Sequence, residues 1–233
     1  MPFSHHSHSG QFCPGHAQDS LEDVIQNAIR KKFRVFALTE HMPRHEKDRY
    51  HEEIQANATL ESMVQNESDY VKEAQRLRYK YQGEIALPLG FESEWCGPHS
   101  LELIQASIQA HPFDFFMGSI HHVRGIPIDY DQDTYNRARE LAGGTDEKLF
   151  EAYFDEQFEM LTALRPPIVG HFDLIRLKSS DFNLDWQQMN GVWSRILRNL
   201  DFVASYHGIL EINTAALRKG MDEPYPKSEI CKV

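Results

Sequence analysis

The chain of 233 residues is long enough for a sizeable core, and we expect a single domain over residues 1–233. Apolar residues make up 41% of the chain, but no apolar run approaches the ~20 residues that a membrane span needs. The N-terminus has no basic stretch leading into an apolar segment, so we expect no secretory signal. The net charge of −11 argues against a nucleic-acid-binding surface, which would need a basic patch. The acidic charge does not exclude an anionic substrate, since bound cations can dominate a local field.

The cysteine content points to a reducing compartment. Cys13, Cys96 and Cys231 form an odd and sparse set, which fits reduced thiols in a cytosolic protein better than a disulfide framework. We therefore expect a cytoplasmic location and no membrane partner. No residue pattern indicates an oligomeric state.

Strand-like and helix-like runs alternate along the chain. A short first strand ends in His6-Ser7-His8, and a helix capped by Asp19 or Ser20 follows. The later strand-like runs are 35–38, 85–91, 113–120, 166–170 and 208–213, and the later helix-like runs are 60–81, 99–110, 146–164 and 185–203. Residues 44–58 are charged and polar, which predicts an exposed loop. The alternation indicates βα units around a parallel sheet or barrel.

Potential metal ligands follow almost every strand-like run. His6 and His8 point the same way if their segment is extended, because strand side chains repeat every two residues. The residues at the ends of later strands are Glu40, His41, Glu92, His121, His171, Glu211 and Asn213. Parallel strands bring such positions to one edge, and imidazoles with carboxylates suit borderline metals such as Zn, Mn or Fe. We therefore expect His6, His8, Glu92, His121 and His171 to converge.

Other candidates have simpler interpretations. Cys13 could be a ligand, but a plain thiol is favoured, and His122 is more consistent with a position behind the ligands, since neighbours on a strand face opposite ways. The remaining histidines that we interpret as scattered surface imidazoles are His45, His51, His99 and His111.

The order and spacing of these motifs resemble a known family. The matching segments are Ser4–Ser9, Cys13–Ala17, Thr39–His41, Gly90–Glu92, Gly118–His122, Gly170–Leu174 and Glu211–Thr214. Together they resemble the histidinol-phosphate phosphatases of the PHP (polymerase and histidinol phosphatase) superfamily, fungal type. The resemblance implies an α/β fold, a distorted (βα)7 barrel with three metals at the C-terminal ends of its strands.

The resemblance also implies roles for individual residues. His6 and His8 match ligands of the first metal, and Glu92 matches the carboxylate that bridges the first and second. His121 and His171 match ligands of the second metal. The third metal would be held by His16 and His41, and the substrate phosphate by Arg176 and Arg218.

One family element is not matched. The family ends its barrel with a seventh strand that bears Asp-x-His, and this sequence stops before such a motif. We therefore expect the last strand of the barrel to be missing, with the Asp ligand of the first metal and the His ligand of the third.

The resemblance implies metal-assisted hydrolysis of a phosphate monoester, L-histidinol phosphate, in histidine biosynthesis. Two alternatives stay open at this point. A metal-dependent amidohydrolase also begins its barrel with His-x-His, although that family commonly has a Lys where this chain offers Glu92. A truncated metal-binding fragment without catalytic activity would carry many of the same motifs.

Overall fold

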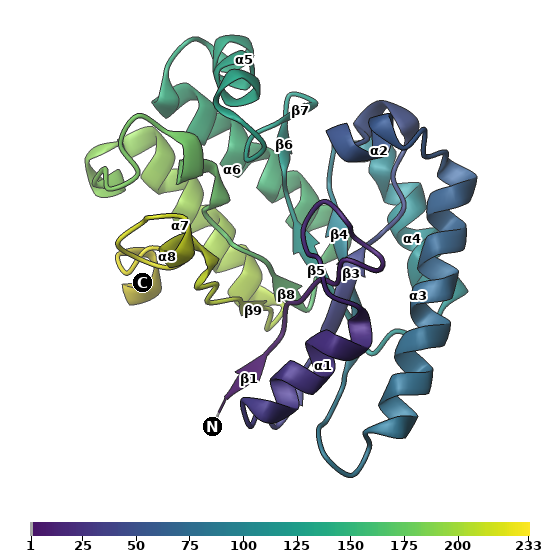
Figure 1. Ribbon diagram of the computed structural model, residues 1–233. Coiled ribbons are helices and arrows are strands. Elements are labelled where there is room, and N and C mark those ends of the chain that lie inside the picture. Colours follow the sequence, from purple (N-terminus) through teal and green to yellow (C-terminus); the bar gives the residue numbers. More distant parts are fainter. Residues whose placement is uncertain (1) are drawn as a thin grey trace. The chain divides into compact units, whose positions relative to one another are not determined.

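The computed structural model describes residues 2–233, which form two compact units (Figure 1). The first unit runs up to Glu94 and includes Glu102–Met117, and the second contains Trp95–Leu101 and Gly118–Val233. The elements of the first unit are β1 (Phe3–Ser4), α1 (Leu21–Arg30), β2 (Val35–Phe36), β3 (Leu38–His41), α2 (His51–Gln55), α3 (Leu60–Lys80), β4 (Leu89–Glu94) and most of α4 (Leu101–Ala110).

The second unit also alternates strands and helices. Its elements are β6 (His122–Val123), β7 (Ile126–Pro127), α5 (Gln132–Ala142), α6 (Asp146–Leu164), β8 (Ile168–Val169), α7 (Asn190–Ser205), β9 (Ile209–Leu210) and α8 (Ala215–Arg218). The boundary between the units falls within β5 (Phe115–Ser119), after Met117.

Parallel strands dominate both units, as the alternation of the sequence predicts. In the first unit β1 pairs with β2, and β3 pairs with β4 in a register that sets His41 beside Glu92. The strand order is β3-β4-β5 in the first unit and β5-β8-β9 in the second, where Ile168 and Ile209 are register partners. The α/β class with a parallel sheet is therefore confirmed, and closure of the strands into a barrel stays a prediction.

A hydrophobic core holds the site-bearing strands of the first unit. Leu21 and Ile25 on α1, and Tyr70 and Leu77 on α3, are buried together against Leu89 of β4. Ser20 caps α1 by accepting a hydrogen bond from the amide of Asp23, which confirms the predicted start of this helix. The hydroxyl of Tyr70 donates to the carbonyl of Gly90, which ties α3 to the strand that carries Glu92.

The second core is rich in aromatic residues. Phe154 on α6 lies between Phe172 and Trp186, with ring centroids 5.7 and 5.4 Å away. α6 packs along α7 (Figure 1). Its observed bounds coincide with the predicted helix, because Thr145 caps the first turn and Arg165 ends the last turn in a left-handed conformation before Pro166.

The expectation of an exposed loop over residues 44–58 is wrong. This segment contains α2, and Arg44 and Asp48 within it are buried. The guanidinium of Arg44 lies 2.6 Å from Glu53 and 4.2 Å from the ring centre of Tyr50. A buried cation with a carboxylate and an aromatic partner is stable, so polarity along the sequence does not reveal its exposure.

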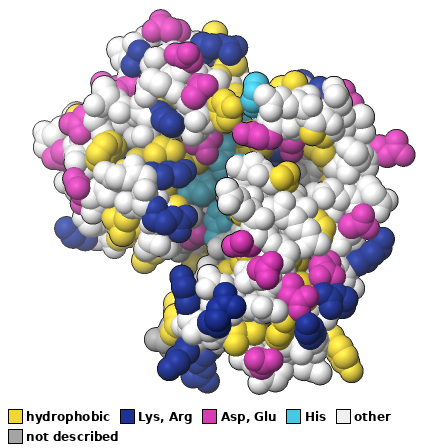
Figure 2. Space-filling model, in the orientation of Figure 1, with side chains coloured by type: hydrophobic (Ala, Val, Ile, Leu, Met, Phe, Trp, Pro, Cys, Tyr) yellow, Lys and Arg dark blue, Asp and Glu magenta, His cyan; other side chains and the backbone are white. Residues whose placement is uncertain are grey.

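The surface carries mixed charge. Figure 2 shows acidic and basic side chains interspersed over the visible face. Ion pairs such as that of Arg76 with Glu22 join side chains of opposite charge. Within the described part of the chain, no helix combines the length and the apolar character needed to span a membrane.

Candidate metal centre

One carboxylate lies among three imidazoles in the first unit. Glu92 Oε2 is 3.1 Å from His6 Nε2, 3.1 Å from His8 Nε2 and 3.4 Å from His41 Nδ1. The side chain of Glu92 is only 1% exposed. A carboxylate buried this deeply needs cationic or hydrogen-bonding partners, and the three rings lie where they can supply them.

Backbone pairing aims the first two histidines at Glu92. The amide of Ala37 donates to the carbonyl of Ser4, and the amide of Ser7 donates to the hydroxyl of Thr39. These contacts keep the segment after β1 extended, so that His6 and His8 face the same side while Ser7 points away and bonds Ala37. The two Nε2 atoms are 3.0 Å apart, on the shared face that the His-x-His spacing predicts.

Glu40 supports His8 from the opposite side. Its Oε1 accepts hydrogen bonds from the amide and the hydroxyl of Ser9, at 2.8 and 2.6 Å, and its Oε2 lies 3.6 Å from His8 Nδ1. A carboxylate behind an imidazole fixes the ring and selects the tautomer whose other nitrogen is free to bind a metal. The sequence identified Glu40 as a strand-end residue but did not predict this supporting role.

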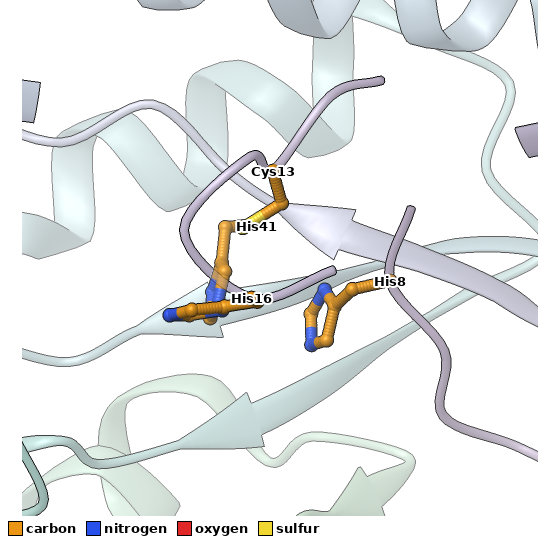
Figure 3. Close-up of side chains that lie close together, drawn as sticks. All are labelled: His8, Cys13, His16 and His41. Atoms are coloured by element: carbon orange, nitrogen blue, oxygen red, sulfur yellow. The ribbon is translucent and has the colours of Figure 1, made fainter. Parts of the chain in front are cut away.

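His16 and Cys13 form a second group with His41. His41 Nε2 is 2.9 Å from His16 Nδ1, and the ligand atoms of Cys13, His16, His41 and His8 all lie within 4.8 Å of one another (Figure 3). His16 and Cys13 come from the loop between β1 and α1, whereas His41 ends β3. The sequence favoured a plain thiol for Cys13. The structure places its sulfur among these potential ligands.

Burial and charge shift the pKa values of two rings in opposite directions. Burial lowers the pKa of His8, but the hydrogen bonds with Glu40 and Glu92 outweigh burial and raise it above its usual value. Burial holds the pKa of His41 well below its usual value, although the charge of Glu92 opposes this effect. A proton and a metal ion would therefore compete for His8, whereas His41 is ready to bind as a neutral ligand.

The second unit contains another pair of histidines. His121 follows β5 and His171 follows β8, and their Nε2 atoms are 3.2 Å apart. Glu211, at the end of β9, accepts a hydrogen bond from the amide of His171 at 2.9 Å, and Asn213 donates to its other oxygen. The strand ends of this unit therefore bring His121 and His171 together, as their positions in the sequence indicate. Convergence of all five expected ligands stays a prediction.

The two arginines occupy different environments. Arg176 is 0% exposed, with Nε 3.0 Å from Asp173 and Nη2 donating to the carbonyls of Glu223 and Pro224. Arg218 ends α8 and is exposed. Arg176 thus holds a loop in place, which limits it to one remaining nitrogen, Nη1, for any phosphate. The phosphate-binding roles of both residues stay predictions.

The other histidines separate into two kinds. His51 and His99 are exposed, as expected, but His45 and His111 are partly buried. His111 Nε2 lies 3.5 Å from the buried carboxylate of Glu67. His122 Nδ1 lies 3.5 Å from Cys96 Sγ inside the second unit.

The donor sets fit divalent metals of borderline softness. Imidazole nitrogens and carboxylate oxygens bind zinc at about 2.0–2.2 Å, so neighbouring ligands of one ion lie roughly 3–3.5 Å apart. The separations of 3.0 Å between His6 and His8, and of 3.1 Å from either ring to Glu92, fall in this range. The separation of 3.2 Å between His121 and His171 does so as well.

Comparisons with known proteins agree with the fold and the motifs. A family model described as the PHP domain matches residues 4–215. The chain is 41% identical, over its whole length and 76% of the relative, to a Schizosaccharomyces pombe protein named "Probable histidinol-phosphatase". It is 31% identical to a Saccharomyces cerevisiae protein named "Histidinol-phosphatase", with 99% of this chain and 78% of the relative covered.

Solved structures share the fold at lower sequence identity. A structure described as the "putative histidinol phosphatase hisK" from Listeria monocytogenes superposes with a TM-score of 0.81 at 23% identity, over 99% of this chain and 89% of that chain. A histidinol phosphate phosphatase from Lactococcus lactis, complexed with zinc, L-histidinol and phosphate, gives a TM-score of 0.69 at 19% identity, over 91% and 73% of the two chains. The extent of the PHP match and the identity to the two yeast proteins show that the chain belongs to the PHP family, among the histidinol-phosphatases.

Proposed function

We propose that the protein is a metal-dependent phosphatase that hydrolyses L-histidinol phosphate to L-histidinol and inorganic phosphate, in histidine biosynthesis. The observation that carries the proposal is the carboxylate of Glu92 within 3.1–3.4 Å of three imidazoles, in a chain 41% identical to a protein named as a histidinol-phosphatase. The Lactococcus lactis relative of the same fold, complexed with zinc, L-histidinol and phosphate, supports the substrate and the need for metal.

The proposed ligands are His6, His8, His16, His41, Glu92, His121 and His171, for divalent metals that we expect to be three ions of Zn, Mn or Fe. Bound divalent ions would supply a water of near-neutral pKa and neutralise the negative charge of the phosphate. Glu92 orients the rings of His6 and His8, and Glu40 fixes the tautomer of His8. With a net charge of −11, the protein as a whole repels phosphate, so the attraction must come from local groups.

Arg176 and Arg218 are the proposed local phosphate ligands of the chain. A guanidinium forms charge-assisted hydrogen bonds with phosphate oxygens, which position the monoester and stabilise the charge of phosphoryl transfer. The partner implied is a small phosphorylated molecule rather than nucleic acid or a membrane. We further propose that residues 1–233 act as one domain of the PHP type in the cytoplasm, which agrees with the reduced thiols that the sequence indicates.

The test compares two adjacent histidines. His6→Gln removes a proposed ligand, whereas His5→Gln changes an exposed neighbour in the same segment. Phosphate release from L-histidinol phosphate and bound metal, measured by elemental analysis, should both fall in His6→Gln and stay at the level of the unchanged protein in His5→Gln. Chelation should abolish activity, and divalent metal should restore it.

Three results would refute the proposal. Phosphate release that survives complete removal of metal would exclude metal dependence. Hydrolysis of amides or lactones without hydrolysis of phosphate monoesters would favour the amidohydrolase alternative, and metal binding without either activity would favour a non-catalytic fragment.

A further inference from the structure

The loop between β1 and α1 places Cys13 and His16 on one side of a single turn. The amide of Cys13 donates to the carbonyl of Ser9 at 2.9 Å, and the carbonyl of Cys13 accepts from the amides of His16 at 3.0 Å and Ala17 at 3.3 Å. Residues three apart in such a turn lie on the same face. The thiol and the imidazole therefore point in the same direction because of the backbone, without any bond between the two side chains.

Several contacts fix this loop to the core. The amide of Gly10 donates to the carbonyl of Asp19 at 2.8 Å and closes the loop, and a Cβ at Gly10 would lie only 2.5 Å from the backbone of Gln18. The carbonyl of Phe12 accepts from Asn66 at 3.0 Å, and the ring of Phe12 packs on Tyr70 with centroids 5.6 Å apart. The position of Cys13, next to Phe12, is thus set by packing and hydrogen bonding.

The thiol faces the two imidazoles of the proposed third metal site. The sulfur of Cys13 and the ring nitrogens of His16 and His41 lie within 4.8 Å of one another (Figure 3). In a tetrahedral zinc site with Zn–S near 2.3 Å and Zn–N near 2.0–2.1 Å, these atoms would be roughly 3.3–3.6 Å apart. The ligand atoms would have to approach one another by at most about 1.5 Å, within the reach of side-chain rotation, to bind one ion together.

We propose that Cys13 Sγ is a ligand of the same divalent ion as His16 and His41, an inference that rests on the proposed metal dependence. Cys13, His16 and His41 are three ligands from the described residues, and the remaining positions on the ion would be open to water, a substrate oxygen or another side chain. His8 is also within 4.8 Å, but its Nδ1 lies next to Glu40 and its Nε2 next to Glu92. We therefore assign His8 to the neighbouring metal position, with His6 and Glu92.

A thiolate ligand has a consequence for metal choice. Sulfur is a soft donor that favours zinc, cobalt and iron over manganese and magnesium, whereas imidazole and carboxylate ligands alone discriminate less. This position therefore selects zinc, cobalt or iron, while the position bounded by His6, His8 and Glu92 accepts manganese as well.

Cobalt substitution tests the ligand directly. The full chain, stripped of metal and titrated with Co²⁺, should develop a sulfur-to-cobalt charge-transfer band in the near ultraviolet. Cys13→Ser should lose this band and bind zinc at this position about tenfold or more weakly. Cys231→Ser removes an exposed thiol and should change neither property. The absence of the band in the unchanged protein, or its persistence in Cys13→Ser, would overturn the proposal.

Alkylation gives an independent measurement. Zinc should protect Cys13 from iodoacetamide while Cys231 reacts at the same rate with and without zinc, as followed by peptide mass spectrometry. If the protein binds metal and hydrolyses the phosphate ester but zinc does not protect Cys13, only the ligand role of this thiol fails. If no divalent metal binds at all, the proposed function fails together with it.

Discussion

The support that Glu40 gives to His8 leads to a quantitative prediction for Glu40→Gln. Within this 2% exposed side chain, Oε1 accepts two hydrogen bonds from Ser9, and Oε2 lies 3.6 Å from His8 Nδ1, which is a charge contact beyond hydrogen-bond distance. Glutamine has the same shape and can still accept from Ser9, so the fold should persist. The substitution removes the negative charge behind the ring of His8.

Two energies follow from this geometry. Hydrogen bonds to a charged acceptor contribute about 1.5–3 kcal/mol and those to a neutral acceptor about 0.5–1.5 kcal/mol, so two weakened bonds from Ser9 cost roughly 2 kcal/mol of folding stability. Loss of a carboxylate behind a metal-binding histidine costs about 10–100-fold in metal affinity. That range corresponds to about 1.4–2.7 kcal/mol at the metal.

Two assays separate these effects. Urea unfolding of the metal-free protein measures the folding term, and competition with a chromophoric chelator measures zinc affinity. Glu46→Gln, an exposed position five residues before α2, is the matched control and should change neither quantity. A zinc affinity for Glu40→Gln within twofold of that of the unchanged protein, in a folded variant, would refute the supporting role of Glu40.

Three further predictions concern stability. Burial raises the pKa of Glu67 from 4.5 to about 7, so the folded state keeps its proton while the unfolded state loses it, and stability declines as pH rises from 4.5 to 7. Glu67→Gln should therefore stabilise the protein by about 1–3 kcal/mol at pH 8 and by much less at pH 5, as measured by urea unfolding. The exposed substitution Glu61→Gln is the control. An effect of Glu67→Gln that does not change with pH would contradict this reasoning. A Cβ at Gly90 would lie 2.9 Å from Phe115, so Gly90→Ala should lower the free energy of unfolding by about 1–3 kcal/mol in the same assay. Gly83→Ala, whose Cβ would have no atom within 4 Å, is the control and should not lower it. A urea midpoint for Gly90→Ala equal to that of the unchanged protein would show that Phe115 can move. With free metal at about 100 times its Kd, chelation should lower the free energy of unfolding by about 2.7 kcal/mol and the Tm measured by calorimetry by roughly 5–11 °C. An unchanged Tm would show that the ligands bind no stabilising ion.

The periodicity of apolar residues and the caps were sufficient to locate the long helices. α3 and α6 span Leu60–Lys80 and Asp146–Leu164, close to the ranges expected from sequence, because each buries one apolar face and begins at a threonine cap. α5 (Gln132–Ala142) was not predicted, since only Tyr135 and Ala138 within it are buried and its apolar pattern is weak. Its two caps, Asp131 before the first turn and Gly143 after the last, were sequence signals that could have located it.

The candidate ligands were accessible from sequence for a related reason. His6, His8, His41, Glu92 and His171 each lie within or just after a short strand, and the parallel pairing of these strands is a local consequence of βα alternation. Candidate ligands at strand ends can therefore be predicted from the sequence, strand by strand.

Only the tertiary structure decided how these side chains are supported and how far apart they are. The support of His8 by Glu40, the burial of Arg176 against Asp173 and the position of Cys13 beside His16 and His41 all depend on contacts between segments that are distant in sequence or turned by a loop. Sequence spacing limits which residues can share a face, but it does not set interatomic distances of 3–5 Å. Those distances come from the packing of the loop and the strands on the core, which determines which oxygen, nitrogen or sulfur atom reaches a given point.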